Sequence, residues 1–147
     1  MSLVDTVKGK VQRMLTEELG SIKIDRDGDF IITHESAVVF VSVFAFNDKE
    51  DSDIVIRCTS PMIKDAPLTS ELTKWVAIEG QHFSFGSCNL NPNEDGTTAW
   101  IYFRYAIVGN DLDQNELLSA VYRTVFTANK LDDELKAKFG GKLFTED

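Results

Sequence analysis

Hydrophobic residues recur at helical spacing in three parts of the chain. In each part, apolar side chains follow one another at intervals of three and four residues, and glycine stands where the pattern stops. At the starts of the second and third parts, Thr69 and Asp113 are typical helix N-caps. We therefore predict three amphipathic helices, which span Leu3 to Leu19, about Thr69 to Glu79, and a long stretch that starts behind the capping sequence Asp113 to Glu116 and ends at Gly140 and Gly141.

Between the helices the pattern changes to short β-prone segments separated by turn residues. Asp25 to Asp29 contains an Asp-Gly pair that favours a tight hairpin, and Asn91 to Gly96 has the composition of a hairpin loop. Pro61 and Pro67 bracket a predicted loop. The predicted strands are Ile22 to Ile24, Phe30 to Ile32, Ala37 to Phe46, Ile54 to Thr59, Gln81 to Asn89, and Thr97 to Val108.

The strand Ala37 to Phe46 is apolar on both of its faces. A strand with one polar face can expose that face to solvent, whereas a strand that is apolar on both faces is expected to be central in its sheet and covered on both faces. We expect either helices on both sides, or helices on one side and a second subunit on the other.

These elements define an α+β fold, an antiparallel sheet packed against helices in the order α-β-β-β(-β)-α-β-β-α. The 147 residues, of which 43% are hydrophobic, suffice for one core without a disulfide or a metal. We expect a single domain over residues 1–147, with no linker and no internal repeat.

The last strand has an unusual outer face. Its odd positions carry the aliphatic and aromatic residues expected of a core, while Trp100, Tyr102 and Arg104 lie at even positions. Tryptophan, tyrosine and arginine are enriched at protein interfaces, so these three residues are the candidate protein-binding site. The alternatives are that the long third helix covers this face, or that aromatic cross-strand pairs stabilise the sheet.

The charge and the hydropathy restrict the partners. The chain carries 15 Lys and Arg against 24 Asp and Glu, a net charge of −9, and it has no basic cluster for nucleic acid. We interpret the acidic residues, among them Asp25 to Asp29, Asp48 to Asp53 and Asp132 to Glu134, as a solubilising rim. The longest apolar run, Ala37 to Val41, is far shorter than the roughly 20 residues of a membrane span. With no secretory signal and two isolated cysteines, we expect a cytoplasmic protein that does not insert into membranes.

Motifs for catalysis and cofactors are not convincing. Asp25, Asp27 and Asp29 alternate as in calcium loops, but Phe30 stands where such a loop needs glycine and Ser36 where it needs glutamate. Neighbours in His34-Glu35-Ser36 point to opposite faces and cannot form a relay. We predict no catalytic residues, no metal site and no cofactor.

A second hypothesis places a pocket between the sheet and the helices. His82, Cys58 and Cys88 would then supply polar groups for a small-molecule-binding domain or an enzyme of unknown class. His82 and Cys88 share one strand face but lie about 20 Å apart along it, so they cannot pair within that strand. A tightly filled core at this place would contradict the hypothesis.

Several sequence patterns resemble the YbjN-like family, which is similar to the class I type III secretion chaperones. The resemblance extends from about Leu3 to Phe144. It rests on the order of elements and on Asp27-Gly28-Asp29, Thr69-Ser70-Glu71-Leu72, Leu112-Asp113, and Leu135-x-x-x-Phe139-Gly140-Gly141.

That resemblance implies a homodimer that holds other proteins or peptides and has no chemistry of its own. We therefore predict a non-enzymatic, chaperone-like module for a protein or peptide client. Its candidate contacts are Trp100, Tyr102 and Arg104.

Overall fold

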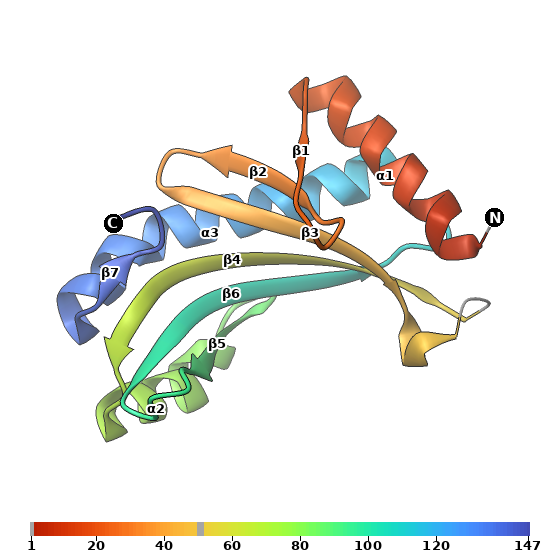
Figure 1. Cartoon of the computed structure of the whole chain (residues 1–147). Coiled ribbons are helices and arrows are strands. Elements are labelled where there is room, and N and C mark those ends of the chain that lie inside the picture. Colours follow the sequence, from red (N-terminus) through yellow and green to blue (C-terminus); the bar gives the residue numbers. More distant parts are fainter. Residues whose placement is uncertain (1, 50–51) are drawn as a thin grey trace.

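Three α-helices and seven strands follow the predicted α+β order in residues 2–49 and 52–147, which the computed structural model describes (Figure 1). A short C-terminal strand is the one addition to the prediction. The elements are α1 (Leu3–Leu19), β1 (Lys23–Ile24), β2 (Phe30–His34), β3 (Ala37–Ala45), the 3-10 turn η1 (Phe46–Asp48), β4 (Ile54–Pro67), α2 (Ser70–Ile78), the 3-10 turn η2 (Glu79–Gln81), β5 (Ser87–Pro92), β6 (Thr98–Val108), α3 (Gln114–Phe139) and β7 (Lys142–Leu143).

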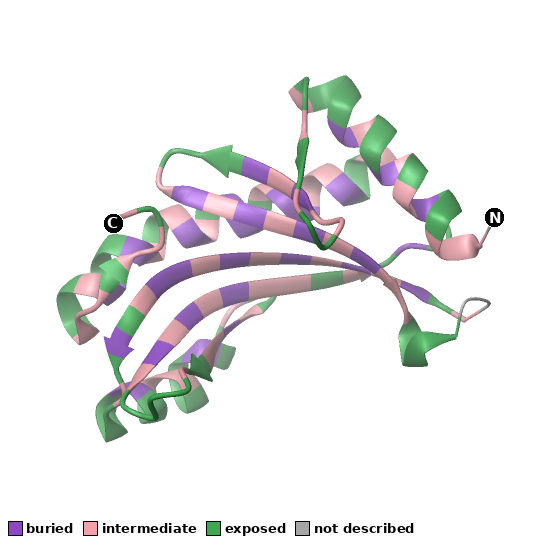
Figure 2. Ribbon diagram, viewed as in Figure 1, coloured by how far each residue is buried: buried purple, intermediate pink, exposed green. Residues whose placement is uncertain are grey.

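The strands form one curved, antiparallel sheet in the order β1-β2-β3-β4-β6-β5. Strand β7 pairs with β4 beyond the point where the pairing of β3 with β4 ends. Helices α1, α2 and α3 pack on one side of this sheet, and α3 runs behind it along most of its width in Figure 1. In Figure 2, buried and half-buried residues alternate along β3 and β6, as expected when only one face meets the helices.

The core has two parts joined by the long helix α3. Beside the N-terminal half of α3, residues of α1, β3 and β4 form the first cluster. Beside its C-terminal half, α2, β5 and β6 form the second. Both predicted caps are confirmed: the Thr69 hydroxyl accepts from the Leu72 amide, and the Asp113 carboxylate accepts from the Glu116 amide.

The predicted loop between Pro61 and Pro67 is wrong, because β4 runs through Pro61 and ends at Pro67. Its pairing with β6 shifts register between Pro61 and Ile63 and again before Ala66. On the other edge, β3 pairs only as far as Thr59, and β7 begins at Ile63. On this edge Pro61 therefore falls in the gap between β3 and β7, where no strand is paired with it, and such an unpaired edge is where a strand tolerates proline.

The predicted strand Gln81 to Asn89 is also wrong in its first half. The chain makes the 3-10 turn η2 there, and β5 begins at Ser87 and extends to Pro92, so the hairpin loop to β6 is shorter than predicted. Gly86 has a φ of +75°, and a Cβ at this position would lie 2.5 Å from the Arg104 carbonyl oxygen. Only glycine permits this close approach of the turn to β6.

Strand β3 is covered by helices on one side only. Its odd residues are buried against α1 and α3, while its even residues are half-buried on the opposite face. The apolar pattern allowed two ways of covering β3, and one of them was a helix on each side. In the described residues, this covering by helices on both sides is not found. The outer face is left without a helix.

Asp132 corrects the interpretation of the acidic residues as a solvent-exposed rim. Only 2% of this residue is exposed. Its carboxylate accepts a hydrogen bond of 2.5 Å from the Ser36 hydroxyl, which also lies 3.0 Å from Asn129 Oδ1. The Asn129 side chain in turn donates to the His34 carbonyl oxygen. This network fastens the β2–β3 turn to α3.

We expect Asp132→Ala to lower the free energy of unfolding by about 1–3 kcal/mol, because the Ser36 hydroxyl loses a buried, charged acceptor. Chemical denaturation measures the change. Asp133→Ala is the matched control, since Asp133 is exposed, and its effect should stay within about 0.5 kcal/mol. Equal effects of the two substitutions would contradict a structural role for the Ser36–Asp132 bond.

Candidate functional site: the open face of the sheet

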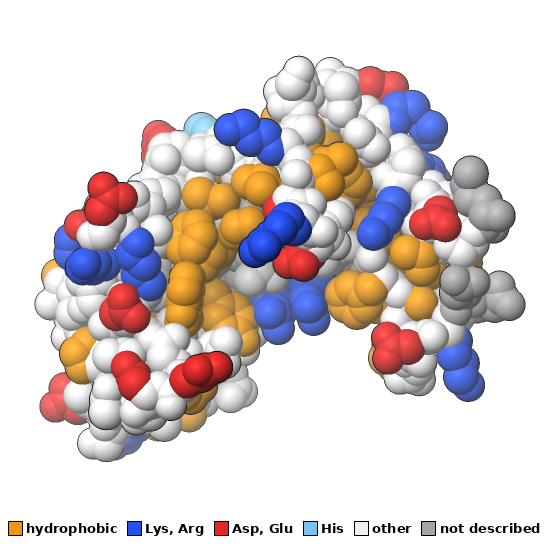
Figure 3. All heavy atoms as spheres, viewed as in Figure 1, with side chains coloured by type: hydrophobic (Ala, Val, Ile, Leu, Met, Phe, Trp, Pro, Cys, Tyr) orange, Lys and Arg blue, Asp and Glu red, His pale blue; other side chains and the backbone are white. Residues whose placement is uncertain are grey.

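The surface that the helices leave uncovered is the side of β3, β4 and β6 that points away from α3. We call it the open face. In Figure 3, hydrophobic side chains gather over the middle of the sheet, where β3, β4 and β6 run in Figure 1, and Lys or Arg side chains border them. The residues that form the open face, all half-buried, are Phe40, Phe44, Arg57, Thr59, Pro61, Trp100, Tyr102 and Arg104.

A hollow of about 220 Å³ lies on this face between β4, β5 and β6. It is lined by Thr59, Pro61, Asn91, Trp100, Tyr102 and Arg104. Strand alternation places its β6 residues on one side of the sheet, and the pairing of Pro61 with Tyr102 sets them beside β4. The structure thus brings together all three residues that the sequence singled out. It also rules out the alternative that α3 covers them, since α3 packs on the other side.

Arg104 lines this hollow and is held by Tyr102 and Thr59. Its guanidinium carbon lies 4.7 Å from the centre of the Tyr102 ring, and its Nε donates to the Thr59 hydroxyl at 3.3 Å. Among the described residues, no acceptor is bound to its two terminal nitrogens, which can therefore donate to a ligand. The hollow therefore combines apolar walls with a fixed cation.

A second arginine, Arg57, lies near Arg104 on the open face. Its guanidinium carbon is 4.7 Å from the centre of the Phe44 ring, and its buried Nε has no hydrogen-bond partner among the described residues. Burial, and then the charge of Arg104, lower the pKa of the Arg57 guanidinium from its usual value. The two positive charges therefore repel each other across the sheet.

The C-terminal segment borders the open face at one end. The Phe144 amide donates to the Met62 carbonyl oxygen beyond β7. The Phe144 ring makes an edge contact with Phe40, with centroids 6.1 Å apart, and a tilted contact with Trp100 at 5.6 Å. Aromatic rings at these distances attract each other. The end of the chain thus supports the aromatic residues of the face.

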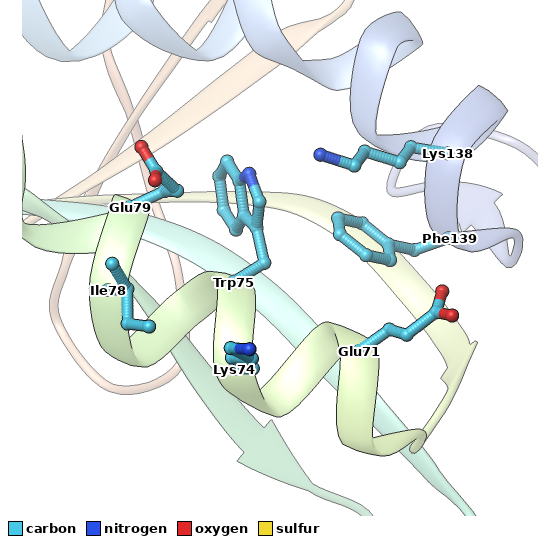
Figure 4. Close-up of a pocket in the computed structure, with 7 residues that line it drawn as sticks. All are labelled: Glu71, Lys74, Trp75, Ile78, Glu79, Lys138 and Phe139. Carbon is cyan, nitrogen blue, oxygen red and sulfur yellow. The ribbon is translucent and has the colours of Figure 1, made fainter.

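A separate groove lies between α2 and the end of α3 (Figure 4). Trp75 and Phe139 face each other across it, with ring centroids 5.7 Å apart, and the Lys138 ammonium lies 5.9 Å from the Trp75 ring. Ile78 is 47% exposed beside them. The groove has a volume of about 330 Å³ and is also lined by Glu71, Lys74 and Glu79.

The three polar groups of the small-molecule hypothesis do not converge. Cys58 lies in the first core cluster and Cys88 in the second, and burial raises the pKa of each thiol to about 12. At neutral pH both thiols are therefore protonated and poor nucleophiles. His82 stands at the surface, where its Nδ1 lies 3.4 Å from a Glu79 carboxylate oxygen. It belongs to a turn and not to the predicted strand.

The other motifs considered in the sequence have structural roles. One carboxylate oxygen of Asp25 accepts from the amides of Asp27 and Asp29, which closes the β1–β2 hairpin turn. The His34 ring packs edge-on against Phe126. In residues 2–49 and 52–147, no three His, Cys, Asp or Glu side chains come together as ligands for a metal ion.

Sequence reasoning missed five residues of the open face, which are Phe40, Phe44, Arg57, Thr59 and Pro61, and it also missed Phe144 at the border of the face. The alternation of β3 and β4 gave a usable signal for the first three, because they occupy the non-core parity of neighbouring strands. Phe144 follows the last helix, and nothing in its local pattern indicated a return to the sheet. Its position depends on β7 pairing with β4.

Comparison with solved structures defines the class of this fold. The chain is similar to the crystal structure of the ExsC–ExsE complex, with a TM-score of 0.60, 14% identity, and coverage of 90% of this chain and 96% of the matched chain. It is similar to the crystal structure of YbjN from E. coli with a TM-score of 0.61, 10% identity, and coverage of 89% and 92%. The predicted type III secretion chaperone-like fold is thereby confirmed.

The family is also shown. Residues 2–147 match the family described as T3SS (YopN, CesT) and YbjN peptide-binding chaperone 1, and the chain belongs to this family of peptide-binding chaperones. The resemblance to YbjN-like proteins is confirmed. No curated protein is similar enough in sequence to count as a relative. No helix in the described part of the chain is long and apolar enough to cross a membrane.

Proposed function

We propose that this protein is a non-enzymatic, chaperone-like module that binds a segment of a client protein on its open face. The single observation that carries the proposal is a sheet face with half-buried aromatic residues and a hollow, over which the described part of the chain places no helix. Trp100, Tyr102 and Arg104 are the proposed contacts. Such residues dominate the binding energy of protein interfaces when they are clustered and partly desolvated.

The comparisons support this proposal. The family is one of peptide-binding chaperones, and ExsC, which shares the fold, was solved in complex with ExsE. The alternation along β6 adds a physical reason. Its core residues on one side anchor the strand, so the residues on the other side are held in place before any ligand arrives.

A library of random displayed peptides, passed over the immobilised full-length protein, tests the proposal. We expect the protein to retain a subset of peptides rich in large apolar residues, and free peptide of the same sequence to compete for binding. Retention no greater than on an unrelated acidic protein of similar size would contradict the proposal.

We further propose that the whole chain, residues 1–147, acts as one domain and forms a homodimer in the cytoplasm. The unpaired Cys58 and Cys88 support a reducing compartment. The groove between α2 and α3 supports the dimer, because it presents apolar side chains between glutamates and lysines. A two-fold contact of this surface with itself can set a lysine of one subunit against a glutamate of the other.

Ile78→Asp tests the dimer at this groove. We expect the substitution to convert the dimer to a monomer, because it buries an unpaired charge in the apolar part of the contact. Light scattering coupled to size exclusion measures the mass. Ile24→Asp is the matched control, since Ile24 is exposed to 49% against 47% for Ile78 but lies on β1, and it should leave the dimer intact. A wild-type monomer at micromolar concentration would contradict the homodimer.

A further inference from the structure

Two arginines stand on the open face without a carboxylate in direct contact among the described residues, although the charge of Asp29 acts on Arg57 and raises its pKa. In residues 2–49 and 52–147, the close contacts between basic and acidic side chains are His82–Glu79 and Lys136–Glu146, and neither Arg57 nor Arg104 takes part in one. The Nε of Arg104 donates a hydrogen bond to the Thr59 hydroxyl, and the buried Nε of Arg57 has no partner among these residues. Buried donors without acceptors are rare in proteins and indicate that a ligand or water completes them.

Their placement on the sheet brings the two arginines close together. Thr59 pairs with Arg104 across β4 and β6, and Arg57 precedes Thr59 by two residues on the same face of β4. The guanidinium group of Arg57 packs against the Phe44 ring, and that of Arg104 packs against the Tyr102 ring. These contacts restrict the motion of both groups. The resulting pair of cations is preorganised and partly desolvated, which strengthens its attraction for an anion.

The overall charge of the protein makes this pair distinctive. A chain with net charge −9 attracts basic molecules through its long-range field. Two adjacent arginines within an aromatic surface oppose that field locally. Guanidinium groups bind carboxylates with paired, planar hydrogen bonds, so a carboxylate is the group that this place fits.

We propose that the Arg57–Arg104 pair is a receptor for an acidic side chain of the client segment, which lies beside a large apolar residue in the hollow at Trp100 and Tyr102. This inference rests on the proposed function and names the class of sequence that the open face binds. Arg104 is two residues from Tyr102 and four from Trp100 on β6, or about 7 and 13 Å along the strand. An extended client segment therefore carries its Asp or Glu two to four residues from its large apolar residue.

To test this inference, the displayed peptide library is passed over three immobilised proteins, and the amino-acid composition of the peptides that each protein retains is compared. The three proteins are the wild type, the variant R57Q/R104Q, and the control R13Q/K130Q, which removes two exposed positive charges from α1 and α3. We expect acidic residues at this spacing to be enriched on the wild type and the control and to fall to the input level on R57Q/R104Q. General charge attraction would enrich basic residues instead.

Individual affinities sharpen the result. For a retained peptide, changing its acidic residue to the matching amide should weaken binding to the wild type about tenfold, because it removes a charge-assisted hydrogen-bonded pair. The same change should have little effect on R57Q/R104Q, which makes the two substitutions a double-mutant cycle. We expect R57Q/R104Q to unfold near the wild-type temperature, because relief of the repulsion between two cations offsets the loss of their ring contacts and of the Thr59 hydrogen bond. If that variant fails to fold, the amide substitution on the wild type alone decides.

Each outcome separates the two proposals. Peptides retained without acidic enrichment, or with enrichment that persists on R57Q/R104Q, would overturn the carboxylate receptor and leave the peptide-binding function standing. Enrichment lost equally on R13Q/K130Q would overturn it as well, since net charge would then be the cause. A library with no retained peptide would overturn the proposed function and this inference together.

Discussion

Phe103→Ala is expected to lower the free energy of unfolding by about 3–5 kcal/mol, a large part of the roughly 5–15 kcal/mol that stabilises a domain. Phe103 lies on the core side of β6 and is 0% exposed. Its ring packs edge-on against Phe83 with centroids 5.4 Å apart. The ring also lies so near Gly86 that a Cβ there would be 2.8 Å from it. Neighbours packed this closely do not collapse readily into the space that alanine leaves.

Chemical denaturation measures the loss, and Phe46→Ala is the control. Phe46 is 54% exposed in η1, so its truncation should change the free energy of unfolding by about 0.5 kcal/mol or less. A Phe103→Ala protein as stable as the wild type would mean that β6 does not turn this side toward the helices. The assignment of Trp100, Tyr102 and Arg104 to the open face would then fail too.

Trp100→Ala is expected to weaken retention of library peptides at least about tenfold, the effect of losing an aromatic hot spot at the centre of an interface. Trp100 is half-buried, lines the hollow, and contacts Phe144. Truncation removes one apolar wall of the hollow. Because the residue lies outside both core clusters, stability should fall by much less than in Phe103→Ala.

The chain has only two tryptophans, which supplies a matched control. Trp75 is also half-buried, but it lines the groove between α2 and α3. Trp75→Ala should leave peptide retention nearly unchanged. Fluorescence polarisation with one retained peptide measures both affinities. A stronger loss with Trp75→Ala than with Trp100→Ala would move the client site from the open face to the groove.

The fold could be predicted wherever one local rule acted alone. The spacing of apolar residues and the caps at Thr69 and Asp113 identified α2 and α3 almost to the residue. Prediction failed where distant segments decide the conformation. Pro61 and Pro67 look like loop residues, but β4 continues between them because β6 pairs with it on one edge and β7 pairs with Ile63 and Lys64 on the other. The turn before β5 depends on the close approach of Gly86 to β6.

The candidate site could be predicted only in part from the sequence, because only some of its residues are grouped by a local pattern. Trp100, Tyr102 and Arg104 share the parity of a single strand, and their grouping needed no tertiary information. Arg57 and Phe40 have the same parity on other strands, but joining them to the first three requires the strand register. The sequence predicted that Asp132 is an exposed acidic residue. Its burial depends on a hydrogen bond from the distant Ser36 hydroxyl, which the local pattern does not indicate.

The central claim is that the open face holds the client segment. Photo-crosslinking tests it most directly: a retained peptide carrying a benzophenone group in place of its large apolar residue is bound to the full-length protein and irradiated. The attached residues are then located by mass spectrometry. Our account predicts crosslinks to the parts of β4, β5 and β6 that line the hollow. These parts contain Thr59 on β4, Asn91 on β5, and Trp100, Tyr102 and Arg104 on β6. Crosslinks confined to α2 and the end of α3, or to α1, would contradict it.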